Sequence, residues 1–164
     1  MKMNKYIFLD IDGVLNSNDY FSSLKHMKRI NKLLEMGFNS SVFHGVSSID
    51  PVAVKNLNKL VKDIGAKIVV SSTWRFSPDL SEIFKISGIE APIFSITPSS
   101  RSRIRGEEIQ AWLDKKAESP YKYVILDDDS DMLRDQLPYF IQVDRMARGL
   151  SENDVKLATK ILNS

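Results

Sequence analysis

Short apolar runs alternate with segments of helical spacing along most of the chain. Five runs are four to six residues long, rich in β-prone residues and bounded by polar or turn residues: 5–9, 67–71, 92–96, 121–126 and 140–143. Such runs are typical of strands buried on both faces. Between them, apolar residues recur every three or four positions, which predicts helices at 20–36, 51–64, 77–88, 106–117 and 151–162. This alternation predicts an α/β, Rossmann-like fold with a parallel sheet and helices on both faces.

Residues with capping preferences mark several of the predicted helix ends. Asp50 and Pro51 suit the N-cap and the first position of one helix, and Gly65 suits its end. Ser151 suits the N-cap of the final helix. Residues 39–48 are rich in serine, which predicts a loop. Residues 17–48 are therefore interpreted as a small helical insertion in a single domain that spans residues 1–164.

Composition excludes some chemistry and leaves the partners open. The chain has no cysteine, so disulfides, thiol catalysis and cysteine-ligated metal centres are excluded. It has 23 Lys and Arg against 21 Asp and Glu, which is too balanced to predict nucleic-acid binding from total charge, although a local basic patch is compatible with it. No apolar run is long enough to span a membrane, and the start shows no secretory pattern. We expect a cytoplasmic protein without membrane contact, and its oligomeric state stays open.

Polar side chains follow three of the predicted strands, at the edge where open α/β sheets bind their ligands. They are Asp10 and Asp12 after the first strand, Ser71 and Ser72 at the end of the second, and Asp127, Asp128 and Asp129 after the fourth. Gly13 lets the chain turn after the first pair. A basic segment with Arg101, Arg103 and Arg105 lies between the second and fourth strands.

These residue types together suit phosphoryl chemistry. Clustered carboxylates repel one another unless a cation neutralises them, and Mg²⁺ prefers oxygen ligands and substrate phosphate. A hydroxyl group and an arginine suit the oxygens of a phosphoryl group. One aspartate can act as the nucleophile, and a second can transfer protons to the leaving oxygen and from water. The pattern predicts magnesium-dependent hydrolysis of a phosphomonoester.

Residues 8–15, 68–71 and 124–128 resemble the first, second and fourth motifs of haloacid dehalogenase (HAD) superfamily phosphohydrolases. The resemblance runs nearly end to end. It implies that Asp10 is the nucleophile and Asp12 the general acid/base. It also implies that the hydroxyl of Ser71, or of Ser72 in the less favoured register, binds the phosphoryl oxygens.

The same resemblance implies a Mg²⁺ site and a basic residue. Asp128 is the favoured magnesium ligand, with Asp127 supporting it and with Asp10 and the backbone carbonyl of Asp12 completing the set. The family usually has a lysine in its third motif, where this chain has three arginines. Arg105 is chosen because it opens a predicted helix, as the family's basic residue often does, and Arg101 and Arg103 are the alternatives.

The spacing of the motifs bears on the substrate. It leaves room for only a small or minimal cap, which predicts an open site suited to a nucleic-acid end or a phosphoprotein. Trp74 could stack on a base and Arg75 could bind a phosphate. Alternatively, Trp74 packs under the following helix and Arg75 pairs with a surface acid. Arg145 and Arg148 could extend a basic rim or could be solvated loop charges.

The first and second motifs and the final helix are similar to phosphatase domains associated with nucleic-acid repair, including those of polynucleotide kinase–phosphatases. The sequence has no kinase-type glycine-rich phosphate loop, so the implied role is that of a phosphatase only. The leading hypothesis is a phosphatase for a polynucleotide end or a nucleotide phosphate. The alternatives are a small-metabolite or phosphoprotein phosphatase, and a non-catalytic HAD-like protein that binds phosphate.

Overall fold

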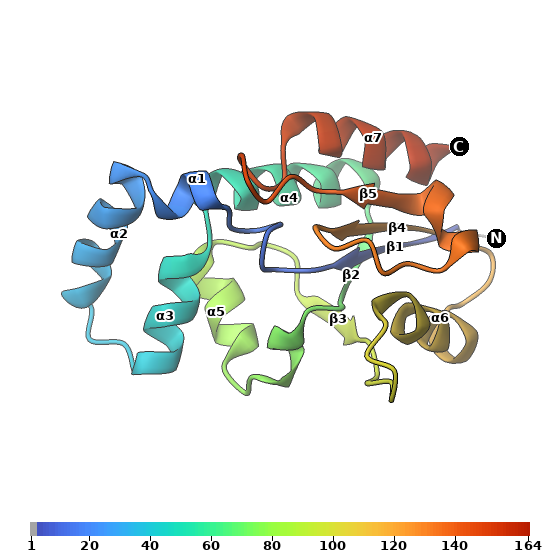
Figure 1. The fold of residues 1–164 in the computed structure, drawn as a ribbon, viewed down its shortest axis with the longest axis horizontal. Helices are drawn as coiled ribbons and strands as arrows, with labels where there is room; N and C mark the ends of the chain where they lie inside the picture. The colour runs from blue at the N-terminus through green and yellow to red at the C-terminus, as the bar shows by residue number, and fades with distance from the viewer. Residues whose placement is uncertain (1–2) are drawn as a thin grey trace.

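A five-stranded parallel sheet forms the centre of the computed structural model, which describes residues 3–164 (Figure 1). Its order is β3-β2-β1-β4-β5, and every pairing between neighbours is parallel. The strands are β1 (Asn4–Leu9), β2 (Lys67–Val70), β3 (Ile93–Ile96), β4 (Tyr121–Asp127) and β5 (Phe140–Gln142). The chain leaves β1 toward β2 on one side and later returns to β4 on the other, so the topological switch point lies at the carboxyl end of β1.

Helices cover both faces of the sheet, as the alternation of strands and helices predicts. Helices α4 (Pro51–Ile64), α5 (Leu80–Ser87) and α7 (Glu152–Asn163) contribute to the core cluster on one face, whereas α6 (Arg105–Lys116) packs on the other face. The central strands are apolar along their length because both faces are buried. On β1, Tyr6 and Phe8 pack with Trp112 of α6, whereas Ile7 and Leu9 belong to the larger core cluster.

The expected capping residues hold the helix ends. An Asp50 carboxylate oxygen accepts a hydrogen bond from the Val52 amide, and Gly65 adopts a positive φ of 68° after α4. At α7, Ser151 and Asp154 form a reciprocal capping box. These local interactions explain why the bounds of both helices match the prediction closely.

The insertion after β1 differs from the prediction in two ways. The expected helix over 20–36 is divided into α1 (Asn18–Phe21) and α2 (Leu24–Leu34), because Ser23 caps a new helix by accepting a hydrogen bond from the His26 amide. The loop expected over 39–48 is wrong, since this segment forms α3 (Ser40–Ser48). Asn39 caps α3, and buried Val42 and Val46 anchor it to the core. The high serine content of this segment favoured a loop, although the i, i+4 spacing of Val42 and Val46 is typical of a helix.

The apolar side expected for the segment 20–36 does not pack on the domain. Leu24, Met27 and Leu34 are 73%, 59% and 64% exposed, and Leu33 is the buried residue of α2. Figure 1 shows α1, α2 and α3 beyond the carboxyl ends of the strands, which is the edge where the predicted catalytic residues lie. None of the helices among residues 3–164 combines the length and apolar character that a membrane crossing requires.

Candidate active site

Asp10 directly follows β1 and is buried at the carboxyl edge of the sheet. Its backbone N–H donates to the carbonyl of Leu126 on β4, and the residue is 6% exposed. Gly13 has a φ of 80°, and a Cβ at this position would collide with the carboxyl group of Asp128. Glycine is therefore required here both for the turn and for the close approach of the two loops.

Three carboxylates meet at this edge. Asp10, Asp127 and Asp128 each offer one oxygen, and these oxygens lie within 4.8 Å of one another. Burial raises the pKa of Asp10 to about 6, although the charge of Arg105 opposes the shift. Burial, followed by repulsion from Asp10, raises the pKa of Asp127 to about 8. The charged forms are therefore disfavoured until positive charge is added.

Asp127 gives a second sign that the cluster suits a cation. Its Oδ2 is buried and has no hydrogen-bond partner among residues 3–164, while Oδ1 accepts from the Asp129 amide. An unsatisfied buried carboxylate oxygen is costly, and a hard divalent cation with oxygen ligands would satisfy it. The donor set thus fits Mg²⁺.

Arg105 supplies the positive charge that the chain itself brings to the cluster. Its Nη1 lies 3.6 Å from Asp10 Oδ1, and its Nε lies 3.7 Å from Asp127 Oδ2. The residue begins α6, where its backbone N–H donates to Asp131. Buried Nη1 has no hydrogen-bond partner among the described residues, so it can donate to a bound anion. Arg101 and Arg103 are exposed on the preceding loop.

The two serines of the second motif have different surroundings. Ser71 continues β2, and its buried hydroxyl has no hydrogen-bond partner among residues 3–164. Hydrogen bonding by the Ser72 side chain opposes the rise in the pKa of Asp10. The Ser72 Oγ also accepts a hydrogen bond from the Trp74 amide. Ser72 therefore lies beside the candidate nucleophile, and both hydroxyl groups remain candidates for a phosphate contact.

Asp12 stands apart from the carboxylate cluster. It is exposed, and both of its carboxylate oxygens accept hydrogen bonds: Oδ2 from Trp74 Nε1 at 2.9 Å and Oδ1 from Asn16 Nδ2 at 3.1 Å. Asn16 is itself held by Gly13, whose backbone N–H donates to Asn16 Oδ1 at 2.7 Å. The carboxylate is thus oriented by two donors while it remains open to solvent, as a proton-transfer group requires.

Trp74 and Arg75 occupy places that neither sequence interpretation fully describes. Trp74 is half-buried against the core, but its indole N–H reaches Asp12. Arg75 is buried and pairs with Glu108, which is also buried, so the expected pairing with a surface acid is wrong. Its remaining N–H groups donate to backbone carbonyls, including those of Ser71 and Ser72. Arg75 therefore supports the second-motif loop from within.

Two contributors to the site, Asn16 and Glu108, were not assigned from the sequence, and a third, Arg145, was expected only as part of a basic rim or as a solvated loop charge. Asn16 orients Asp12, Glu108 neutralises Arg75, and Arg145 Nη1 lies 3.2 Å from Asp128 Oδ2. The position of Asn16, four residues after Asp12, was a local signal for the first. The other two contacts join segments far apart in the chain, and no periodicity indicates them.

Residues 6–155 match the family model of the HAD domain in Swiss Army Knife RNA repair proteins. The chain belongs to this family. This match confirms the resemblance to HAD phosphohydrolases of the RNA-repair type, and the parallel sheet confirms the fold class. Membership supports a phosphatase of the HAD type in general and the use of Mg²⁺, for which this HAD domain has the cluster described above. Neither the curated proteins nor the solved structures gave a match.

Proposed function

We propose that this HAD domain is a magnesium-dependent phosphatase that removes a terminal phosphate from a polynucleotide. The observation that carries the proposal is the division of the acidic residues. Buried Asp10 lies among Asp127, Asp128 and Arg105, whereas Asp12 lies outside the cluster and is held by two hydrogen-bond donors. This division supports Asp10 as the nucleophile that attacks phosphorus and Asp12 as the proton-transfer group.

The first chemical step breaks the bond between phosphorus and the leaving oxygen. An oxygen of Asp10 attacks phosphorus and forms an aspartyl phosphate, and Asp12 gives its proton to the leaving oxygen. Arg105 and Ser72 hold the phosphoryl oxygens during this transfer. Asp10, Asp127 and Asp128, with the backbone carbonyl of Asp12, would hold Mg²⁺, which supplies positive charge to offset that of the phosphoryl group and the carboxylates.

The second step releases the enzyme. Asp12 takes a proton from a water molecule, the water oxygen attacks phosphorus, and the bond to Asp10 breaks with release of inorganic phosphate. Asp12 is exposed, so water can reach it once the leaving group has departed. The two donors that hold its carboxylate keep it on the same side of the site in both steps.

The choice of a polynucleotide substrate rests on two observations. The matched family is that of domains in RNA repair proteins. The insertion consists of three helices of 4, 11 and 9 residues, which is small for a segment that would enclose a small molecule. An open site of this kind accommodates the end of a long chain.

The test is phosphate release from p-nitrophenyl phosphate, from free nucleotides and from a 3′-phosphorylated oligonucleotide, each with Mg²⁺ or with chelator. Asp10→Asn is nearly isosteric and removes the charge of the nucleophile, so we expect turnover to fall by about a thousandfold or more. Asp63→Asn, on the exposed side of α4, is the matched control and should behave as wild type.

Each result decides between specific alternatives. A preference for the oligonucleotide over free nucleotides and small phosphate esters supports the polynucleotide reading, and the reverse preference points to a small-metabolite phosphatase. Full activity of Asp10→Asn would refute the assigned nucleophile. Binding of the phosphorylated oligonucleotide without any turnover would instead indicate a non-catalytic phosphate-binding protein.

A further inference from the structure

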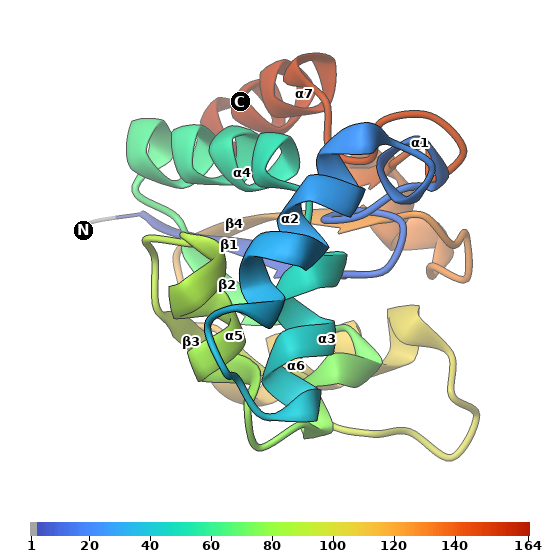
Figure 2. The same ribbon diagram turned by 90° about the vertical axis from the view of Figure 1, so that its left-hand side faces the viewer.

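A row of exposed lysines lines a hollow beside the insertion. Lys25, Lys28 and Lys32 lie on one side of α2, because Lys28 and Lys32 come three and seven residues after Lys25. With Tyr20 and Val52, they line a hollow of about 270 Å³ between α2 and the start of α4. Figure 2 shows α2 across the front of the molecule, with the start of α4 behind it.

A second hollow, of about 620 Å³, adjoins the first. The two share Tyr20, Lys25, Asp50 and Val52, and the second adds Ser17 and Arg148. Ser17 directly follows Asn16, which orients the proposed general acid/base. We call the two hollows together the α2 groove, defined by Ser17, Tyr20, Lys25, Lys28, Lys32, Val52 and Arg148.

The loop that carries Arg148 connects this groove to the carboxylate cluster. Arg145 in the same loop pairs with Asp128, and its carbonyl accepts a hydrogen bond from the Asn18 amide at the start of α1. Figure 2 shows this loop, which follows β5, beside α1. Basic side chains therefore follow one another from the catalytic edge to the far end of α2.

The positive charge of the groove is only partly neutralised. Its lining also includes Arg29, whose Nε donates to the Val46 carbonyl, and two acids, Asp19 and Asp50. Asp50 is engaged in capping α4. Within residues 3–164, none of the ion pairs involves Lys25, Lys28 or Lys32.

We propose that the α2 groove binds the phosphodiester backbone of the nucleic-acid strand whose terminal phosphate reaches Asp10. This inference rests on the proposed function and adds to it a binding site outside the catalytic centre. Lys25, Lys28 and Lys32 are spaced along the helix axis by about 4.5 Å and about 6 Å, so they can each meet a different phosphate of one strand. Their contacts release counterions and carry no base information, which suits a repair enzyme that meets ends of varied sequence.

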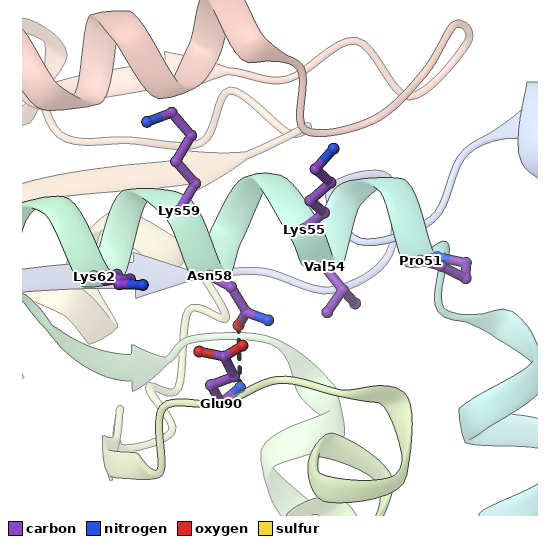
Figure 3. A pocket seen from close by; sticks show the side chains of 7 residues that line it. All are labelled: Pro51, Val54, Lys55, Asn58, Lys59, Lys62 and Glu90. Carbon is purple, nitrogen blue, oxygen red and sulfur yellow. Dashed lines mark hydrogen bonds between the residues drawn. The ribbon is translucent and has the colours of Figure 1, made fainter.

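A second lysine-rich pocket provides a matched control. Lys55, Lys59 and Lys62 lie along α4 and line a pocket of about 390 Å³ with Glu90 (Figure 3). The pocket runs along α4 from Pro51, which also lines the first hollow, but none of its three lysines lines the α2 groove. Lys59 is also paired with Asp63. Replacing these lysines removes the same charge without touching the α2 groove.

The test compares two triple variants, Lys25→Gln/Lys28→Gln/Lys32→Gln and Lys55→Gln/Lys59→Gln/Lys62→Gln. Affinity for a labelled 3′-phosphorylated oligonucleotide of about 12 nucleotides, a length within the range that single-strand binding sites cover, is measured at several salt concentrations in the Asp10→Asn background. Loss of three phosphate contacts should reduce the slope of log affinity against log salt by about 2. Between about 50 and 200 mM salt, wild-type affinity should therefore fall about 20-fold more than that of the α2 variant.

Turnover of p-nitrophenyl phosphate separates this proposal from the proposed function. The α2 variant should keep this turnover while its kcat/KM for the oligonucleotide falls, and Lys25→Arg/Lys28→Arg/Lys32→Arg should restore the oligonucleotide reaction. An equal loss of affinity in the α4 variant would refute the groove, because the effect would then reflect total charge. Unchanged affinity in the α2 variant would also refute binding of nucleic acid in the groove. It would indicate an acidic protein surface as the partner of the groove instead. Failure of wild type to hydrolyse any substrate would overturn the proposed function, while the binding slopes would still report on the groove.

Discussion

Glu108→Gln tests whether a buried ion pair supports the active site. Arg75 Nη2 lies 2.9 Å from Glu108 Oε2, and the two side chains are 3% and 8% exposed. The other carboxylate oxygen accepts from the Ser100 amide. The amide that replaces this carboxylate has nearly the same shape, but it leaves the guanidinium of Arg75 buried without a counter-charge.

The expected loss is large for a protein of this size. Removing one partner of a buried ion pair costs about 3–5 kcal/mol of unfolding free energy, compared with a total of about 5–15 kcal/mol for a typical domain. For 164 residues, an unfolding entropy of about 2.1 cal/mol/K per residue means that 1 kcal/mol shifts Tm by about 3 °C. Glu108→Gln should therefore lower Tm by about 9–15 °C.

Thermal unfolding followed by circular dichroism measures this shift, with urea unfolding at 25 °C as an independent value. Asp63→Asn is the control, because it breaks the exposed pair with Lys59 and should change Tm by no more than about 2 °C. A Tm for Glu108→Gln within about 3 °C of wild type would refute the reasoning. It would mean that the carbonyls around Arg75 suffice to hold its charge.

Two further predictions concern the acidic residues of the site. Trp74→Phe removes the indole N–H that holds Asp12, and only a poor leaving group depends on a general acid. The variant should therefore slow hydrolysis of an alkyl phosphate about tenfold more than hydrolysis of p-nitrophenyl phosphate. Equal losses for the two substrates in steady-state kinetics would contradict this. Burial raises the pKa of Asp127 from 3.8 to about 8. Between these two pH values, Asp127 is protonated in the metal-free folded state and ionised in the unfolded chain. The free energy of unfolding should therefore fall as pH rises from about 4 to about 8. Asp127→Asn should flatten that fall in urea titrations with chelator, and an undiminished slope in the variant would rule out Asp127 as its source.

The sheet and the catalytic edge could be predicted because their signals are local. Buried parallel strands must be apolar along their length, and the residues after them must lie at one edge. Asp10, Asp12 and Asp127 were therefore assigned to one edge from sequence position, whereas Arg105 was chosen through the resemblance to the family's third motif. The ends of α4 and α7 could also be predicted from the sequence, because a helix cap depends on residues within one helical turn.

The remaining features depend on contacts that no local pattern contains. The hydrophobic spacing of α2 predicted a buried face, whereas Leu24, Met27 and Leu34 are exposed and Leu33 is buried. The different surroundings of Ser71 and Ser72 follow from one residue of register at the end of β2. The bonds from Trp74 to Asp12 and from Arg75 to Glu108 join separate loops and helices.

The pair formed by Arg75 and Glu108 has a consequence for how the molecule moves. It ties the loop after β2, which carries Ser72, to α6, which begins with Arg105, so it links the two residues proposed to bind the phosphate. Any rearrangement of either segment during turnover would have to separate two buried charges, which is costly. We therefore expect the loop after β2 and the start of α6 to keep their relative position throughout the catalytic cycle.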